Sequence, residues 1–192
     1  DTLLLRLIEI SDLCNDAEIA YEKDTWVPHG APTEAALKAL AEKAGYMKEE
    51  VLKEDEIPFD SEYKYHATLY KINGKKMILA NGAPERLIAI CGLQETDEGT
   101  NPVNRNKWEE IIEMAAARGQ RLIGCAYSEV PDEKSNISHE DMNEKMVFAG
   151  IVGIIDPPRP EAIESIRICK NAGIRVKMIT GDHVLTASEI GM

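Results

Sequence analysis

HATLYKINGKKMILA, residues 66–80, consists of two strand-like runs that only Asn73-Gly74 separates. An Asn-Gly pair between such runs favours a tight two-residue turn, because both residues accept positive φ angles. The segment therefore predicts an antiparallel β-hairpin. A hairpin alone is barely stable in water, so further strands and helices must cover it.

The flanking sequence supplies these elements. Strand patterns extend back to Glu56 and recur at 121–130 and 146–155. Helical patterns with apolar periodicity or capping signals occupy 3–20, 32–44, 84–91 and 104–119. Residues 92–103 predict a polar loop, and the acidic stretch 131–145 predicts a surface loop with about one helical turn.

Asp156-Pro-Pro-Arg159 marks the expected domain boundary, since two consecutive prolines end a strand and stiffen the chain. Beyond it we expect a helix at 160–172, a strand at 174–178 and a turn at Thr180-Gly181-Asp182. The predicted fold is α/β (α+β). A twisted, mostly antiparallel sheet with packed helices occupies residues 1–155, and a short incomplete Rossmann-like segment occupies 156–192.

Composition excludes several classes of protein. The 192 residues, 44% of them hydrophobic, suffice for one folded domain and a fragment. With 34 acidic against 22 basic residues, the net charge of -12 argues against nucleic-acid and anionic-membrane binding but permits a phosphorylated ligand in a local pocket. No apolar run approaches the roughly 20 residues of a membrane helix. The four cysteines form no CxxC pair and predict reduced core thiols.

Asn81-Gly82-Ala83-Pro84-Glu85 occupies the junction between the hairpin and a helix. Gly82 allows a ligand to approach the backbone, and a helix start offers free N–H groups. A plain strand-to-helix turn explains the same residues. Upstream, Phe59 and Lys64 are suited to stack on a base and to meet its edge or a phosphate, or else they are a core aromatic and a solvated cation.

Three further sites carry the same ambiguity. Glu34 is either a pocket carboxylate or a residue favoured by the helix dipole. Arg121 is either a phosphate contact or a surface cation. Thr180-Gly181-Asp182 follows an expected parallel strand, where α/β sheets bind ligands, yet it also suits a tight turn with Asp182 as a helix cap.

Seven segments, taken in order, resemble the landmarks of the P-type ATPase family. They are LCNDAEI (13–19), GAPTEAAL (30–37), IPFDSEYK (57–64), NGAPE (81–85), ARGQR (117–121), DPPRPEA (156–162) and MITGDH (178–183). The resemblance covers nearly the whole chain and is stronger to cation pumps of the calcium-pump type than to heavy-metal pumps. It implies a nucleotide-binding domain at 1–155, followed by the hinge and part of the phosphorylation domain at 156–192.

The resemblance also implies roles for individual residues. Phe59 would stack on the adenine of ATP, Glu34 and Lys64 would meet the base, and Arg121 would reach toward the phosphates. Asn81, Gly82 and Ala83 would line the pocket. Asp156 and Arg159 would belong to the hinge, and Thr180, Gly181 and Asp182 would hold the transferred phosphate, with Asp182 near Mg²⁺ in the parent protein.

Two positions depart from the family pattern. The family usually has Lys at position 81 and commonly Asp at position 31, where this chain has Asn81 and Ala31. The missing cation predicts a weak site for the isolated chain, with a Kd on the order of 1 mM or weaker, about -4 kcal/mol.

The family's DKTGT and GDGxND motifs are absent from this sequence, so we expect this monomeric, soluble chain to bind ATP without hydrolysing it. The resemblance makes it a cytoplasmic domain of an integral membrane ATPase, partnered by the remaining phosphorylation, actuator and transmembrane domains. Two alternatives are a docking or regulatory module with little nucleotide affinity, and a self-sufficient hydrolase that uses Asp182.

Overall fold

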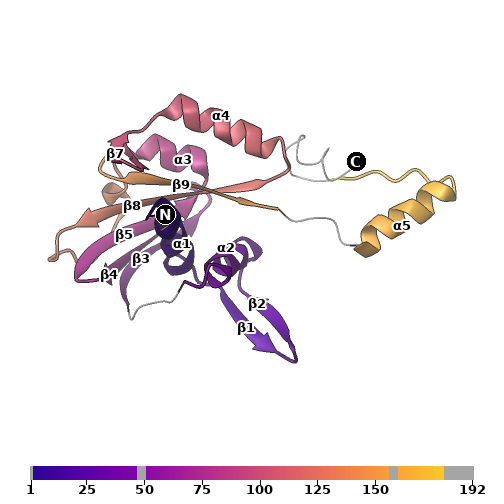
Figure 1. The fold of residues 1–192 in the computed structure, drawn as a ribbon, viewed down its shortest axis with the longest axis horizontal. Coiled ribbons are helices and arrows are strands. Elements are labelled where there is room, and N and C mark those ends of the chain that lie inside the picture. The colour runs from indigo at the N-terminus through magenta and orange to yellow at the C-terminus, as the bar shows by residue number, and fades with distance from the viewer. Residues whose placement is uncertain (1, 47–50, 156–159, 180–192) are drawn as a thin grey trace.

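A seven-stranded sheet is the centre of the computed structural model, which describes residues 2–46, 51–155 and 160–179 (Figure 1). All neighbouring strands pair antiparallel except β6 and β9, which pair parallel. The predicted mostly antiparallel α+β architecture is confirmed. In sheet order the strands are β3 (Leu52–Asp60), β4 (Tyr65–Ile72), β5 (Lys75–Gly82), β8 (Arg121–Val130), β9 (Val147–Ile154), β6 (Leu93–Thr96) and β7 (Gly99–Pro102).

The predicted hairpin is confirmed as β4 and β5, with Ile72 paired to Lys75. Asn73 and Gly74 have φ angles of 50° and 80°, as the Asn-Gly turn requires. Burial is nearly complete along β5, where every residue from Lys76 to Gly82 is buried. This strand is therefore covered on both faces.

Helices cover the two faces of the sheet in pairs (Figure 1). α1 (Thr2–Leu13) and α2 (Pro32–Lys43) lie on one face, and α3 (Pro84–Ile90) and α4 (Arg105–Ala116) lie on the other. Alternate residues of β5 divide between the two cores. Ile78 packs with Leu87 and Phe148 beneath α3, while Leu79 packs with Ile10 beneath α1.

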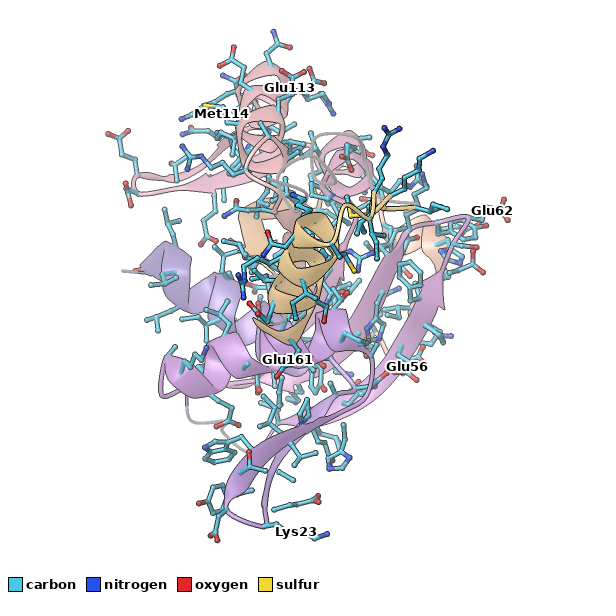
Figure 2. The ribbon with its side chains drawn as sticks, turned by 90° about the vertical axis from the view of Figure 1, so that its right-hand side faces the viewer. Lys23, Glu56, Glu62, Glu113, Met114 and Glu161 are labelled. Carbon is cyan, nitrogen blue, oxygen red and sulfur yellow. The ribbon has the colours of Figure 1, made fainter. Side chains whose placement is uncertain are left out.

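The helix expected at 3–20 is shorter than predicted. α1 ends at Leu13, and β1 (Glu18–Glu22) and β2 (Thr25–His29) follow as a separate hairpin. Figure 2 shows this hairpin extending from the body of the domain, with Lys23 at its tip. The helix ends because the side chain of Asn15 accepts a hydrogen bond from the backbone N–H of Ala17, which replaces the next helical turn.

The polar loop expected at 92–103 was also wrong, because it forms the short hairpin of β6 and β7. The surface stretch 131–145 contains the expected helical turn at His139–Asp141. At the opposite edge of the sheet, β3 has register shifts between Lys53 and Asp55 and between Ile57 and Asp60. Phe59 therefore stands outside the regular ladder.

Beyond residue 159, α5 (Pro160–Asn171) confirms the predicted helix. The strand predicted at 174–178 does not form, since Ile174, Val176 and Met178 are exposed and no described strand lies beside them to complete a ladder. The hinge residues Asp156 and Arg159 and the turn Thr180-Gly181-Asp182 lie outside the described residues. The domain boundary at 155/156 stays a prediction. No helix in the described ranges is both long and apolar enough to cross a membrane.

Glycine is required at position 82 by the close approach of β4. A Cβ atom there would lie 2.3 Å from the carbonyl oxygen of Lys64 and 2.6 Å from the Cα of Tyr65. That carbonyl also accepts a 2.9 Å hydrogen bond from the N–H of Ala83. The backbone at Lys64 and Tyr65 therefore cannot move aside to admit a side chain at position 82.

Replacing this glycine should be costly. We expect Gly82→Ala to lower the free energy of unfolding by about 3 kcal/mol or more, because two backbone segments must separate. Gly153→Ala on β9 is the matched control, since the three atoms nearest to its Cβ all belong to the end of the movable Gln120 side chain, and its effect should stay within about 0.5 kcal/mol. Urea denaturation measures both. Equal losses in the two variants would contradict the steric explanation.

Three buried thiols make the stability of the fold fall at alkaline pH. Burial raises the pKa of Cys14, Cys91 and Cys125 from 9.0 to about 12. Unfolded thiols ionise first as the pH rises, so the native state loses stability above pH 9 by about 1.4 kcal/mol per pH unit for each thiol.

Cys125→Ala should remove the contribution of one thiol to this alkaline loss of stability. Near pH 8 the wild type should be more stable than the variant, because the variant leaves a cavity. Above about pH 9.5 we expect this difference in unfolding free energy to shrink by about 1.4 kcal/mol per pH unit. Urea denaturation of both proteins across this range tests it. A difference that stays constant with pH would contradict the assigned ionisation.

Candidate functional site

A pocket of about 490 Å³ opens at the end of the sheet where β3 ends, β4 and β8 begin, and β5 leads into α3. Its size is typical of small-molecule sites. The seven predicted nucleotide-binding residues all line it, although they come from four separate parts of the chain. They are Glu34, Phe59, Lys64, Asn81, Gly82, Ala83 and Arg121.

Phe59 presents its ring to solvent at the mouth of this pocket. Its side chain is 63% exposed. Lys64, in the turn between β3 and β4, adopts a φ of 59° and is also exposed. An aromatic surface and a cation therefore share the rim of the pocket.

The opposite side of the pocket comes from the start of α2. Glu34 lies in the first turn of this helix and is half-buried. The side-chain amide of Asn15 donates to the backbone carbonyl of Glu34 at 2.8 Å and to that of Ser11 at 2.9 Å. Asn15 thus connects the end of α1 to the start of α2 and positions Glu34.

Asn81 and the backbone at 82–83 form the interior of the pocket. Asn81 is 8% exposed, and its side-chain amide donates to the carbonyl of Cys14 at 2.5 Å. The residue that departs from the family pattern therefore joins β5 to the end of α1. Arg121, the first residue of β8, is exposed on the rim.

Sequence reasoning missed several lining residues: Thr33, Leu37, His66, Leu122 and Ile123. The sequence held no signal for His66, because Lys64 lies in a turn and the alternation of strand side chains begins only after it. The role of Asn15 was not foreseen either, although it lies within the LCNDAEI segment.

The model of the family described as P-type ATPase, cytoplasmic domain N, matches residues 3–161. The chain belongs to this family. The resemblance inferred from its seven segments is thereby confirmed, and the pocket lies in a domain N.

Curated relatives agree with this membership. The chain is 40% identical to the cation-transporting ATPase pma1 of Synechocystis in an alignment of 183 residues that covers 93% of the chain and 20% of the relative. It is 36% identical to a calcium-transporting ATPase of Listeria monocytogenes over 193 residues, which cover 97% of the chain and 22% of that relative. A sodium/potassium exporting P-type ATPase of Schizosaccharomyces pombe is 35% identical over 193 residues, with 96% and 18% covered. The chain spans about a fifth of the length of these relatives.

The link made by Asn15 is testable through stability. Asn15→Ala should lower the free energy of unfolding by about 1–3 kcal/mol, because the carbonyls of Ser11 and Glu34 and the N–H of Ala17 lose a partner. Asn15→Asp should cost at least as much, since it keeps the acceptor for Ala17 but places a carboxylate oxygen against the carbonyl oxygens of Ser11 and Glu34. Asn101→Ala on exposed β7 is the control, with an effect within about 0.5 kcal/mol. Thermal denaturation compares them, and a loss in Asn15→Ala no larger than the control's would refute the link.

Proposed function

We propose that this domain N binds ATP by its adenine base and holds it for phosphoryl transfer to an aspartate that this chain lacks, within a P-type cation-pumping ATPase. The observation that carries the proposal is the convergence of residues from α2, β3, β5 and β8 on one pocket. Together these segments bring an exposed aromatic ring, a carboxylate and two cations to one pocket, which are the groups that a nucleotide would need.

The pocket offers complementary groups to each part of the nucleotide. The exposed ring of Phe59 can stack on adenine, which contributes about 1–3 kcal/mol. Glu34 can accept a hydrogen bond from the exocyclic amino group of the base. Gly82 and Ala83 line the pocket and carry no side chain larger than a methyl group, so a flat ring can approach the backbone there.

Two cations serve different parts of the ligand. Lys64 and Arg121 are both exposed on the rim; Lys64 can meet the edge of the base, and Arg121 can donate charge-assisted hydrogen bonds to phosphate oxygens. Asn81 adds no charge and already donates to the carbonyl of Cys14. These few terms support a Kd on the order of 1 mM or weaker for the isolated chain.

The remaining assignments follow from family membership. Asp156 and Arg159 would form a hinge whose closure brings ATP to the phosphorylation domain, and Thr180, Gly181 and Asp182 would contact the transferred phosphate and approach Mg²⁺. The other phosphorylation, actuator and transmembrane domains would complete the pump. By itself this chain would bind nucleotide without turning it over.

Adenine stacking is tested by titrating the chain with AMP and following backbone amide shifts by NMR. We expect saturable shifts around the pocket, and Phe59→Ala should weaken binding by about tenfold because the stacking surface is lost. Trp26→Ala removes an aromatic that is 67% exposed but lies on β2 outside the pocket, and it should bind AMP like wild type.

Comparing ATP with adenosine tests whether Arg121 contacts the phosphates. Arg121→Ala should weaken ATP severalfold more than it weakens adenosine, since only ATP offers phosphate oxygens to the guanidinium. Submicromolar ATP binding would contradict the weak site. An absence of shifts up to about 10 mM AMP would leave the docking-module alternative instead.

A further inference from the structure

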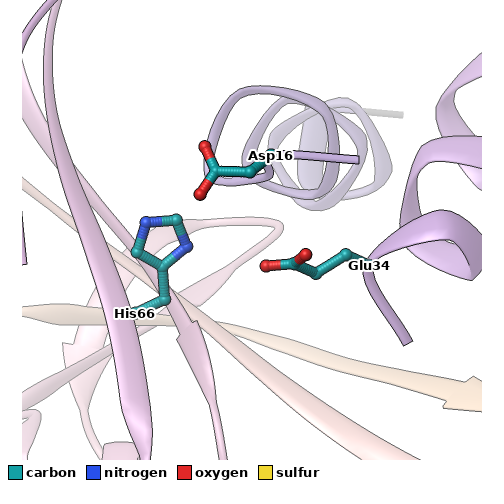
Figure 3. Close-up of side chains that lie close together, drawn as sticks. All are labelled: Asp16, Glu34 and His66. Atoms are coloured by element: carbon teal, nitrogen blue, oxygen red, sulfur yellow. The ribbon is translucent and has the colours of Figure 1, made fainter. Parts of the chain in front are cut away.

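Three potential metal ligands meet beside the pocket. Asp16 follows α1, Glu34 lies in the first turn of α2, and His66 lies on β4. Figure 3 shows the imidazole ring of His66 next to both carboxylates. Ligand atoms of the three side chains all lie within 4.8 Å of one another, although the residues are far apart in the sequence.

His66 is an unusual member of this group because it is only 3% exposed. Within the described part of the chain, its Nε2 atom is buried and has no hydrogen-bond partner. The nearest carboxylate oxygen is that of Glu56, at 3.8 Å, which is too long for a hydrogen bond. A buried nitrogen without a partner costs stability, and a ligand bound at this nitrogen would relieve that cost.

A cation already stands beside this cluster. The ammonium group of Lys53 lies 3.2 Å from Asp16 and also pairs with Glu56. Burial alone would lower the pKa of Lys53, but hydrogen bonds to Glu56 and Asp16 raise it above its usual value. Lys53 is one-third exposed and can therefore move into solvent when another cation takes its place at Asp16.

We propose that Asp16, Glu34 and His66 form a binding site for a divalent transition-metal cation of the zinc class. One imidazole nitrogen and two carboxylate oxygens are a ligand set that zinc accepts, with water free to complete the coordination. Mg²⁺ prefers oxygen ligands alone and gives up its waters reluctantly, so the imidazole discriminates against it.

The three side chains can reach the separations that zinc coordination requires through small movements. Ligands about 2.0–2.2 Å from zinc lie roughly 3.5 Å from one another, so the present separations of up to 4.8 Å must shrink by about 1 Å. Rotation of two side chains can supply this, because Asp16 is exposed and Glu34 is half-buried. Cys14 does not compete for the metal: it is buried and donates to the carbonyls of His66 and Leu79.

The site would regulate nucleotide binding, and this part of the inference rests on the proposed function. Glu34 and His66 line the adenine pocket, whereas Asp16 does not. A metal held by all three would engage the carboxylate that the base needs. Zinc and adenine would therefore compete.

Direct zinc binding is the first test, by calorimetry and by the ¹⁵N shifts of the histidine side chains, without nucleotide. All proteins carry Cys169→Ser, which removes the one thiol that is not buried. We expect one site at which the His66 ring nitrogen shifts, and excess Mg²⁺ should not displace the zinc. Asp16→Asn, on an exposed side chain, should weaken zinc about tenfold or more, and His66→Phe likewise. Lys53→Gln should strengthen it severalfold by removing the competing ammonium.

Adenosine then separates the two proposals, because it lacks the phosphates that chelate zinc. Zinc should weaken adenosine binding in wild type but not in Asp16→Asn, which keeps the pocket intact. Phe59→Ala should lose adenosine yet bind zinc normally. Zinc binding without adenosine binding would sustain the metal site and sink the adenine pocket. Zinc affinity unchanged in Asp16→Asn, or no zinc binding at all, would overturn the metal site.

Discussion

Strand β5 is covered on both faces, and the arrangement of the domain follows from this constraint. Its side chains alternate between the core beneath α1 and the core beneath α3, so neither pair of helices can be removed without exposing it. The strand ends at Gly82, where the backbone of β4 passes too close for any side chain. The pocket opens at this end of the strand, where β5 leads into α3.

Local signals predicted much of this architecture. Asn73-Gly74 specified the central turn, and Pro32 and Pro84 specified the starts of α2 and α3, because each acts through its own backbone geometry. Elements that depend on distant partners were harder to predict. The end of α1 is determined by the side-chain bonds of Asn15, one of which reaches the carbonyl of Glu34, 19 residues away. Periodicity alone extended that helix into β1.

In the candidate site, too, some residues could be predicted from local sequence, whereas others depend on distant partners. The pocket residues could be named in advance because they lie in segments that resemble a known family, and the structure brings those segments to one rim. His66 could not be singled out in this way, since a lone histidine in an apolar strand is usually a core residue. Its meaning depends on the carboxylates that the fold brings beside it from α1 and α2. Glu34 consequently belongs both to the lining of the pocket and to the cluster with Asp16 and His66.

The irregular edge of β3 has a further consequence for the behaviour of the domain in a crowded cell. β3 is an edge strand, and open edges invite pairing with strands of other molecules. Pro58 offers no N–H to such a partner, and the register shifts at 53–55 and 57–60 interrupt any continuous ladder. The ring of Phe59 can therefore stay exposed without that edge becoming a template for aggregation.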